Sequence, residues 1–286
     1  MEQRVEFNTE LIKRYDVAGP RYTSYPTAVQ FNDGFDAEAY RRHTAASNSE
    51  LIPKPLSLYV HLPFCKSLCY YCGCMKKVTR HTHQADHYLT LLDREIEMQG
   101  ELFDHDREVV QLHFGGGTPT FHDDAQLKSL MEQLGRHFAL SRDDTREFSI
   151  EVDPRTVGVE RLAALAGMGF NRISLGVQDI DPAVQKAVNR IQDTESTLAM
   201  IEGSRQLGFN SVSVDLIYGL PLQTVESFSA TIDTVVAAGP NRLVVYPGCL
   251  LHSGLVDPAV DVNPDPRTGR LTANIFVDFF PLETNQ

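Results

Sequence analysis

Apolar and polar residues alternate in blocks along the middle of the chain. Short apolar segments that fit β-strands take turns with longer segments in which apolar residues recur at helical spacing. Strands that alternate with helices in this way predict parallel βαβ units. The six strand candidates are residues 55–64, 109–114, 147–152, 171–177, 210–221 and 241–247, and the helical segments between them are residues 87–100, 125–138, 159–170, 197–209 and 225–239.

Polar residues and glycines gather where the predicted strands end. A series of βαβ units forms an open doubly wound sheet or a barrel, and in both folds the chemistry occurs at the carboxyl ends of the strands. The tripeptide Gly-Phe-Asn precedes two of the strands, which fits a glycine helix cap that leads into the next strand. One shared site is expected from the residues at the strand ends, which are His61, residues 115–118, Glu151, Asp153, Gln178, Asp179 and Asp215.

This periodicity divides the chain into three regions. Residues 1–54 form an N-terminal arm that includes the segment GPRYTSYPT, whose prolines, tyrosines and hydroxyls predict an ordered arm rather than a helix. Residues 55–246 carry the alternating strands and helices. Residues 247–286 are rich in turn-forming residues, and only residues 274–280 indicate a further short strand.

Composition and charge exclude several classes of function. The chain has 286 residues and a formal net charge of −12, which disfavours a nucleic-acid surface because such a surface needs a positive field. The sequence contains no apolar run long enough for a transmembrane helix, and its start does not resemble a signal peptide. We therefore expect a cytoplasmic protein with reduced thiols and no membrane contact.

Four of the five cysteines lie close together, between residues 65 and 74. The first three, Cys65, Cys69 and Cys72, have the spacing C-x3-C-x2-C. Disulfides are disfavoured in a cytosolic chain, and zinc sites usually need two separated pairs of ligands. Thiolates at this spacing on a tight loop can ligate three irons of a cubane cluster and leave the fourth iron for a non-protein ligand. A zinc loop or a chance cluster is the alternative.

The three cysteines, with Tyr71 directly before the last of them, resemble the signature of the radical S-adenosylmethionine (SAM) superfamily. This resemblance implies a 4Fe–4S cluster held by Cys65, Cys69 and Cys72, with the open iron chelated by the methionine part of SAM. One electron from the cluster then cleaves SAM to methionine and a 5′-deoxyadenosyl radical. The implied fold is α/β, a partial (βα)6 radical SAM barrel with parallel strands, an N-terminal arm and a short irregular C-terminal tail.

A longer set of motifs resembles the oxygen-independent coproporphyrinogen III oxidase family. The motifs are PRYTSYPT, YVHLPFC, HFGGGTPT, SIEVDPR, GVQD and DLIYGLP, together with a fourth cysteine, Cys74. The resemblance implies a monomeric radical SAM oxidoreductase of haem biosynthesis, which decarboxylates two propionates of coproporphyrinogen III to the vinyl groups of protoporphyrinogen IX. It also implies an electron donor such as flavodoxin or ferredoxin, and a Cys74 that lies near the cluster without ligating it.

The same resemblance assigns contacts to two SAM molecules. Tyr59, Gly116 and Glu151 match contacts to the first, and Tyr71 matches the aromatic residue beside the adenine. On the residues alone, Tyr59 could equally be a core tyrosine, Glu151 a solvated strand end and Arg190 a surface residue that caps its helix. The residues that match contacts to the second SAM are Gly117, Thr118, Gln178, Arg190 and Asp215.

A tetrapyrrole with four carboxylates needs basic residues near the mouth of its site. The candidates are Arg21 in the N-terminal arm, and Lys76, Lys77 and Arg80 after the cysteines. A solvated charged loop is the ordinary alternative for each of them.

The resemblance ends near Tyr246, where the family continues into a long C-terminal domain. Residues 247–286 resemble only the extreme end of that family, so we expect a truncated remnant with a junction near Tyr246, and we give Cys249 no role. The alternative functions are those of a relative without oxidase activity, such as a haem-carrying chaperone, or of a chain that cleaves SAM without substrate turnover. The last is expected if the lost domain normally covers the open end of the barrel.

Overall fold

A computed structural model describes residues 8–15, 30, 32–247 and 275–278 of the chain. Residues 1–44 and 45–286 form two compact units, and each is described by itself. Helix α1 (Thr9–Tyr15) belongs to the first unit, and helix α2 (Ala37–Asn48), which the sequence analysis did not predict, runs across the boundary. The segment GPRYTSYPT lies outside the described residues, so the ordered arm stays a prediction.

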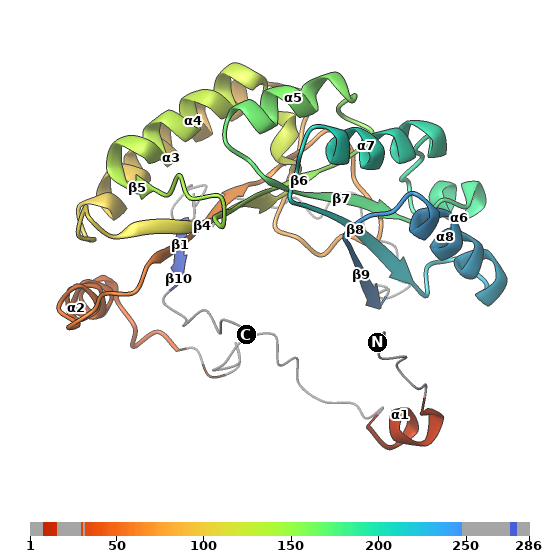
Figure 1. Cartoon of the computed structure of the whole chain (residues 1–286), viewed down its shortest axis with the longest axis horizontal. Coiled ribbons are helices and arrows are strands. Elements are labelled where there is room, and N and C mark those ends of the chain that lie inside the picture. Colours follow the sequence, from red (N-terminus) through yellow and green to blue (C-terminus); the bar gives the residue numbers. More distant parts are fainter. Residues whose placement is uncertain (1–7, 16–29, 31, 248–274, 279–286) are drawn as a thin grey trace. The chain divides into compact units, whose positions relative to one another are not determined.

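Six parallel strands form the main sheet of the second unit (Figure 1). All six strand candidates are confirmed, and they pair in chain order because each helical connection returns the chain to the next position in the sheet. The sheet is open in the described part of the chain, with β9 at one edge, which agrees with a partial barrel. The strands are β1 (Leu56–Leu62), β4 (Glu108–Gly116), β6 (Glu147–Val152), β7 (Arg172–Gln178), β8 (Ser211–Tyr218) and β9 (Arg242–Pro247).

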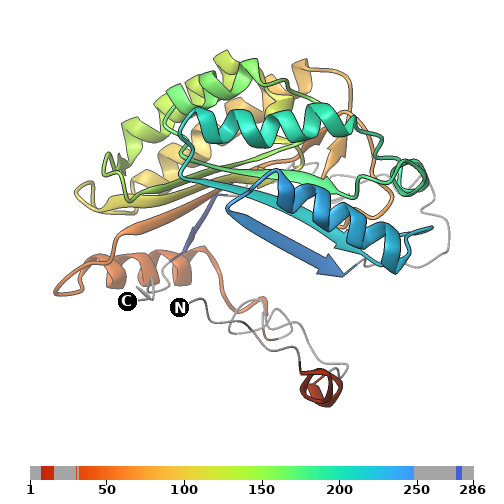
Figure 2. The ribbon, with the colours of Figure 1, turned by 45° about the vertical axis from the view of Figure 1, so that its right-hand side comes forward.

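Helices connect these strands, and several of them lie together over one face of the sheet (Figure 2). Helix α4 begins with a capping box, in which Asp123 and Gln126 each accept the other's backbone amide hydrogen. The short helix α6 (Pro182–Ala187) and the 3-10 turn η2 (Pro119–Phe121) were not predicted. The five predicted helices are confirmed as α3 (His83–Gly100), α4 (Asp124–His137), α5 (Glu160–Gly167), α7 (Thr194–Gln206) and α8 (Val225–Ala237).

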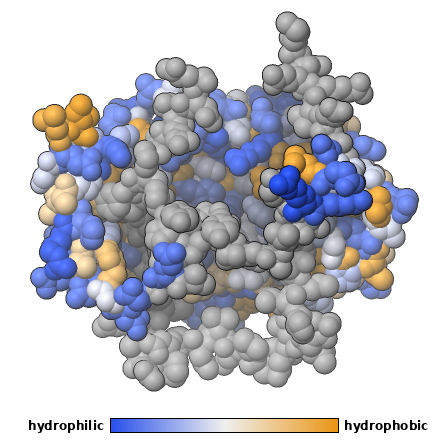
Figure 3. All heavy atoms as spheres, turned by 90° about the horizontal axis from the view of Figure 1, so that it is seen from below, coloured by the Kyte–Doolittle hydropathy of each residue, from blue (hydrophilic) through white to orange (hydrophobic). Residues whose placement is uncertain are grey.

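Strands β1, β6 and β7 alternate between buried and half-buried residues, so the sheet has two unlike faces. On β6, Phe148, Ile150 and Val152 are buried, whereas the residues between them are half-buried. The buried strand residues join helix residues such as Leu92 and Leu127 in one large hydrophobic cluster. Figure 3 views the molecule from the side opposite these helices, and the half-buried residues of β6 and β7 on that face of the sheet are mostly polar. We call this second, polar face the inner face of the sheet.

The helix-to-strand junctions repeat one local structure. Gly169 and Gly208 have φ angles of +103° and +81°, in the left-handed region that glycine enters without strain, as the predicted helix caps require. The side-chain oxygen of Asn171 then accepts the Phe148 amide hydrogen at 2.9 Å, and the Asn171 amide donates to the Phe148 carbonyl at 2.9 Å. Asn241 makes the same pair of bonds with Val212 of β8.

Of the remaining strands, β10 and β5 pair with the main sheet, and β2 and β3 form a separate two-stranded sheet. The short strand predicted within residues 274–280 is confirmed as β10 (Ile275–Asp278), but its antiparallel pairing with β1 was not expected. Short strands β2 (Phe64–Cys65), β3 (Lys77–Val78) and β5 (Ala139–Leu140) were also missed. Among the described residues, no helix combines the length and the apolar character needed to cross a bilayer. The three predicted regions, 1–54, 55–246 and 247–286, stay predictions.

Candidate functional site

The cysteine segment forms a closed loop directly after β1. Its ends pair as the parallel strands β2 and β3, with Phe64 opposite Lys77 and Cys65 opposite Val78. Within the loop, the Cys72 amide donates to the Cys69 carbonyl at 3.1 Å, which makes a tight turn. The loop therefore starts at the carboxyl end of β1, where the sequence analysis expects the site.

This loop is fixed against the segment that joins α6 to α7. The Tyr70 amide donates to the Val188 carbonyl at 3.1 Å, and the side-chain amide of Asn189 donates to the Leu68 carbonyl at 2.6 Å. Asn189 has a φ of +54°, which asparagine tolerates better than most residues. Asn189 and Leu68 are 121 residues apart in sequence, so no local pattern could have indicated their contact.

Two largely buried arginines and one aspartate surround the sulfur of Cys69. A guanidinium nitrogen of Arg155 and one of Arg190 each lie 3.4 Å from Cys69 Sγ. Both arginines also bind the Asp153 carboxylate, at 2.6 Å and 3.3 Å respectively. Burial by itself would raise the pKa of Asp153, but Arg190 and Arg155 hold that pKa below its ordinary value. Two cations against one anion leave net positive charge beside Cys69.

The other two predicted cluster ligands have different neighbours. The Thr118 hydroxyl donates to Cys65 Sγ at 3.6 Å, although burial raises the pKa of the Cys65 thiol overall. The pKa of Cys72 is lowered to about 5, first by a hydrogen bond with the side chain of Cys74 and then by the nearby ammonium group of Lys76. Cys74 therefore lies beside a predicted ligand, as the resemblance implied.

The donor set suits an iron–sulfur cluster. Thiolates are the ligands of such clusters, and the Lys76 ammonium group helps to lower the pKa of the Cys72 thiol. A cubane bonds each thiolate through a different iron, so three cysteines on one loop can hold it and leave the fourth iron open. The residues therefore fit the predicted cluster.

The glycines after β4 are needed by contacts within the protein. Gly116 has a φ of +111°, and a Cβ there would lie 2.6 Å from the ring of His61. A Cβ on Gly117 would lie 2.6 Å from the Pro63 carbonyl carbon. The amides of Gly117 and Thr118 donate to the carbonyls of Leu62 and Phe64 at 2.9 Å and 2.8 Å. Close packing on β1 and β2 thus explains this segment, and its predicted contacts to SAM stay predictions.

The first group of predicted SAM residues lies at the carboxyl ends of β1 and β6. The Tyr59 hydroxyl lies 3.0 Å from His61 Nδ1, and His61 Nε2 lies 3.0 Å from the Met75 carbonyl oxygen in the cysteine loop. Burial raises the pKa of Tyr59, and the Glu151 carboxylate adds to that effect. Glu151 itself lies 3.1 Å from His113 Nε2 and is only partly exposed, so it is not a freely solvated strand end.

The second group lies at the ends of β7 and β8. Gln178 has a φ of +70° at a bulge between β7 and β8, a strained conformation that often marks a functional site. The Asp215 carboxylate accepts the Ser174 hydroxyl hydrogen at 2.9 Å, and burial raises the pKa of Asp215. Arg190 is 7% exposed, so the alternative of a surface residue was wrong. Tyr71 packs against a small apolar cluster that includes Val188 and Leu220, and burial raises its pKa.

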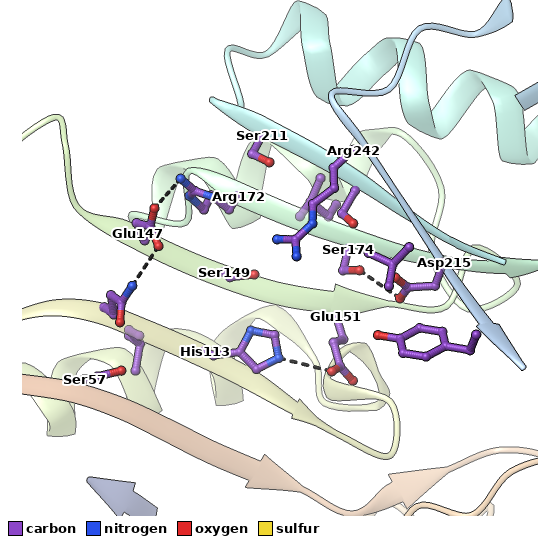
Figure 4. A pocket seen from close by; sticks show the side chains of 16 residues that line it. Ser57, His113, Glu147, Ser149, Glu151, Arg172, Ser174, Ser211, Asp215 and Arg242 are labelled. Atoms are coloured by element: carbon purple, nitrogen blue, oxygen red, sulfur yellow. Dashed lines mark hydrogen bonds and ion pairs between the residues drawn. The ribbon is translucent and has the colours of Figure 1, made fainter. Parts of the chain in front are cut away.

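A cavity of about 430 Å³ opens on the inner face of the sheet (Figure 4). Two of the predicted SAM residues line it, Glu151 near the carboxyl end of β6 and Asp215 in the middle of β8. Its walls come from β1, β4 and β6 to β9. The polar residues that line it are Ser57, Gln111, His113, Glu147, Ser149, Glu151, Arg172, Ser174, Ser211, Ser213, Asp215, Arg242 and Tyr246.

The basic residues predicted to meet a substrate do not line this cavity. Lys76 donates to the Cys72 carbonyl at 2.7 Å, so it holds the cysteine loop. Lys77 lies on β3, Arg80 is exposed and Arg21 lies outside the described residues. Arg242 of β9, which the sequence analysis passed over, is the cationic residue of the cavity without a carboxylate partner among the described residues.

Comparison with known proteins decides the family. The family model described as the radical SAM superfamily matches residues 59–235. This chain belongs to the radical SAM superfamily. The radical SAM match includes the cysteine loop and the strands from Tyr59 of β1 through β8. A second model, described as a family of unknown function (DUF6445), matches residues 223–277.

Curated relatives share the sequence of this radical SAM chain closely. It is 48% identical over 246 residues to "Oxygen-independent coproporphyrinogen III oxidase" of Pseudomonas aeruginosa, which covers 86% of this chain and 53% of the relative. It is 48% identical over 244 residues to the protein of that name from Escherichia coli K12, which covers 85% of this chain and 52% of the relative. The chain thus spans about half the length of the curated relatives it matches.

A solved structure confirms the predicted α/β radical SAM fold. Its title is "Coproporphyrinogen III oxidase (HemN) from Escherichia coli is a Radical SAM enzyme", and it matches with a TM-score of 0.77 and 46% sequence identity. The match covers 86% of this chain and 54% of that chain. Membership in the radical SAM superfamily implies a 4Fe–4S cluster and SAM as cofactors, and the cysteine loop provides a donor set that fits the cluster.

Proposed function

We propose that this chain performs the chemistry of an oxygen-independent coproporphyrinogen III oxidase. The reaction is the oxidative decarboxylation of two propionates of coproporphyrinogen III, which gives the vinyl groups of protoporphyrinogen IX. The observation that carries the proposal is the 48% identity over 246 residues to a curated protein of that name. The polar inner face and the cysteine loop support it, because they supply a cofactor end and a cavity on the same side of the sheet.

In this proposal the chain's own residues hold the cofactors and shield them. Cys65, Cys69 and Cys72 hold the cluster, and Arg155 beside Cys69 stabilises negative charge on the ligand sulfur. When bound, the cluster and SAM supply a 5′-deoxyadenosyl radical that takes a hydrogen atom from the substrate. Each propionate loses one hydrogen atom, one electron and carbon dioxide as it becomes a vinyl group. The electron must pass to an acceptor, and the chain contributes position and exclusion of water.

The predicted SAM contacts form part of the proposal. Tyr59 and Glu151 lie near the cysteine loop and suit the first SAM, while Gln178 and Asp215 border the sheet end further along and suit a second. Arg190 has a buried Nε with no hydrogen-bond partner among the described residues, and a second SAM would provide one. Coproporphyrinogen III as substrate, flavodoxin or ferredoxin as electron donor, a monomeric state and a cytoplasmic location complete the proposal.

A second candidate function is cleavage of SAM without turnover of a tetrapyrrole. The observation that favours it is the match of residues 59–235, which include the cysteine loop, to the radical SAM superfamily model. Membership at that level predicts cleavage of SAM and leaves the substrate open.

Product analysis after anaerobic reconstitution tests the two candidates together. The protein is loaded with iron and sulfide, reduced, and supplied with SAM and coproporphyrinogen III. The oxidase predicts 5′-deoxyadenosine and vinyl product in fixed proportion, at a rate typical of enzymes. The second candidate predicts 5′-deoxyadenosine alone. Formation of neither product by protein that contains a complete cluster would refute both.

A further inference from the structure

The charged residues on the inner face of the sheet are mostly paired. Arg172 of β7 forms an ion pair with Glu147 of β6. His113 of β4 lies 3.1 Å from the Glu151 carboxylate. Gln111 donates to the second oxygen of Glu147 at 2.9 Å, which completes the partners of that carboxylate. The charges of Arg172, Glu147 and Glu151 are therefore satisfied by partners within the sheet.

Arg242 is the exception on this face. It begins β9 and lines the cavity, and Figure 4 shows its guanidinium group extending from β9 toward Ser149 and Ser174. Among the described residues, it has no hydrogen bond and no ion pair. Its charge nevertheless acts on Asp215, whose pKa it lowers against the larger effect of burial. A guanidinium group offers five donors in a planar fork that matches a carboxylate.

The strand register connects this arginine to the cofactor end of the site. Glu151 is paired with Ser174, Ser174 with Ser213, and Ser213 with Arg242. These four residues thus form one row across β6, β7, β8 and β9. Three strand spacings of about 4.8 Å separate the ends of the row by about 14 Å along the sheet. Two serine hydroxyls lie between a predicted cofactor contact and an unpaired cation.

We propose that Arg242 binds a carboxylate of the ligand held in this cavity, with Ser213 as a neighbouring hydroxyl donor. Two ligands of the proposed function carry a carboxylate that is free to accept, a propionate of the tetrapyrrole and the methionine carboxylate of the second SAM, so the identity of the ligand rests on the proposed function. A cavity of about 430 Å³ admits one such arm or the methionine part of SAM. The position of Arg242 across the row from Glu151 suits a ligand that reaches the cofactor end with a second group.

A purely internal role predicts something different. If Arg242 only offsets the negative charge of Asp215, its loss should change the proton affinity of Asp215. The preference of the protein for ligands that carry a carboxylate should then stay the same. If it binds a ligand carboxylate, its loss should weaken only those ligands that carry one. The two roles are therefore separable by binding measurements that involve no turnover.

Fluorescence titration with coproporphyrin III, the oxidised form of the proposed substrate, provides the first arm of the test. We expect Arg242→Met to weaken binding about tenfold or more, and Arg242→Lys to keep part of the affinity because it retains charge without the fork. The tetramethyl ester of coproporphyrin III should bind Arg242→Met and the unchanged protein alike. Arg205→Met is the matched control, since Arg205 lies on α7 outside the cavity and pairs with Glu202.

Equilibrium binding of SAM to the reconstituted protein provides the second arm. Loss of SAM affinity with unchanged coproporphyrin binding supports the proposal and identifies the methionine carboxylate as the partner. If the unchanged protein binds SAM but no porphyrin, the proposed substrate fails and this arm alone decides the role of Arg242. Equal affinities of Arg242→Met and the unchanged protein for every ligand that binds would overturn the proposal. Iron content and circular dichroism of each variant report whether it folds.

Discussion

The two faces of the main sheet are built from the same strands and are held in different ways. On β6, Phe148, Ile150 and Val152 enter the hydrophobic cluster, whereas Glu147 and Glu151 line the cavity. The first face needs only apolar side chains of fitting volume, since burial of apolar surface is not directional. The inner face needs specific partners, because each charged or polar group must be paired or hydrated.

This difference separates stability from function along a single strand. A change on the helix-covered face should lower the free energy of unfolding and leave the chemistry of the surviving folded protein intact. A change on the inner face or in the cysteine loop should do the reverse. The predictions below test that separation, beginning with the largest expected effect.

Replacement of a cluster ligand should abolish the cofactor without unfolding the chain. Cys65→Ala, Cys69→Ala and Cys72→Ala each remove one thiolate, so each should lose the 4Fe–4S absorption and its shift on addition of SAM. Cys74→Ala is the matched control and should retain iron. The measurements are iron content and visible absorption after anaerobic reconstitution. One zinc per chain without iron–sulfur absorption would contradict the cluster assignment.

Neighbouring residues of β6 should differ in their contribution to stability. Ile150 is fully buried, so Ile150→Ala should lower the free energy of unfolding by about 3 kcal/mol through lost contacts and a cavity. Ser149 faces the cavity, and Ser149→Ala should change that free energy by less than about 0.5 kcal/mol. Denaturant unfolding of the two variants measures both values. Similar losses in both would show that the inner face also carries packing energy.

His122 tests the apolar side of the sheet through the pH dependence of the free energy of unfolding. It is fully buried beside Phe64 and Phe121, and burial lowers its pKa to about 4. The folded protein therefore binds this proton less readily than the unfolded chain, whose ordinary histidine pKa is about 6.5. The stability associated with neutral His122 is complete above pH 6.5 and falls as the pH drops toward 4, by about 3 kcal/mol in all.

His122→Phe should remove this pH dependence, because phenylalanine does not titrate. The substitution should also break no hydrogen bond, since both ring nitrogens lack a partner among the described residues. The unfolding free energies of the variant and the unchanged protein should therefore diverge as the pH falls from 6.5 to 4, with the variant more stable. Denaturant titrations at several pH values measure this difference. Parallel curves across that range would show that the imidazole keeps an ordinary pKa.

The smallest effect is expected at the predicted second SAM. Asp215→Ala and Gln178→Ala should weaken it about tenfold, which is about 1.4 kcal/mol, while cluster-dependent cleavage of the first SAM continues. Asp215→Ala should not lower stability, since Asp215 is a half-buried carboxyl whose pKa is raised by burial. Equilibrium dialysis gives the stoichiometry. A single SAM per cluster in the unchanged protein would remove the basis for the second site.

Much of this arrangement could be predicted from local patterns. The period of the apolar residues predicted all six parallel strands and five helices, because each strand and helix has one apolar face. The spacing of the cysteines predicted a loop with a donor set that suits a cluster. These features depend on residues that are near one another in sequence.

Contacts between distant segments could not be predicted in this way. The pairing of β10 with β1, the bond from Asn189 to Leu68 and the two guanidinium groups beside Cys69 each join segments far apart in sequence. Arg242 was missed for a related reason. Arg242 stands out only because the other cationic residues of the cavity form ion pairs. Which of them do so depends on the register of four strands.

The junctions at Asn171 and Asn241 have a consequence for how the chain could misfold. A strand that slips by one residue exchanges its two faces, which would place Ser149 and Glu151 among the helices and Ile150 in water. Each asparagine exchanges two hydrogen bonds with one particular residue of the preceding strand, Phe148 or Val212. These bonds fix the register of the strand, because they can form only when its residues point to the correct faces of the sheet. Selection for a polar inner face thus constrains a residue that never touches the cavity.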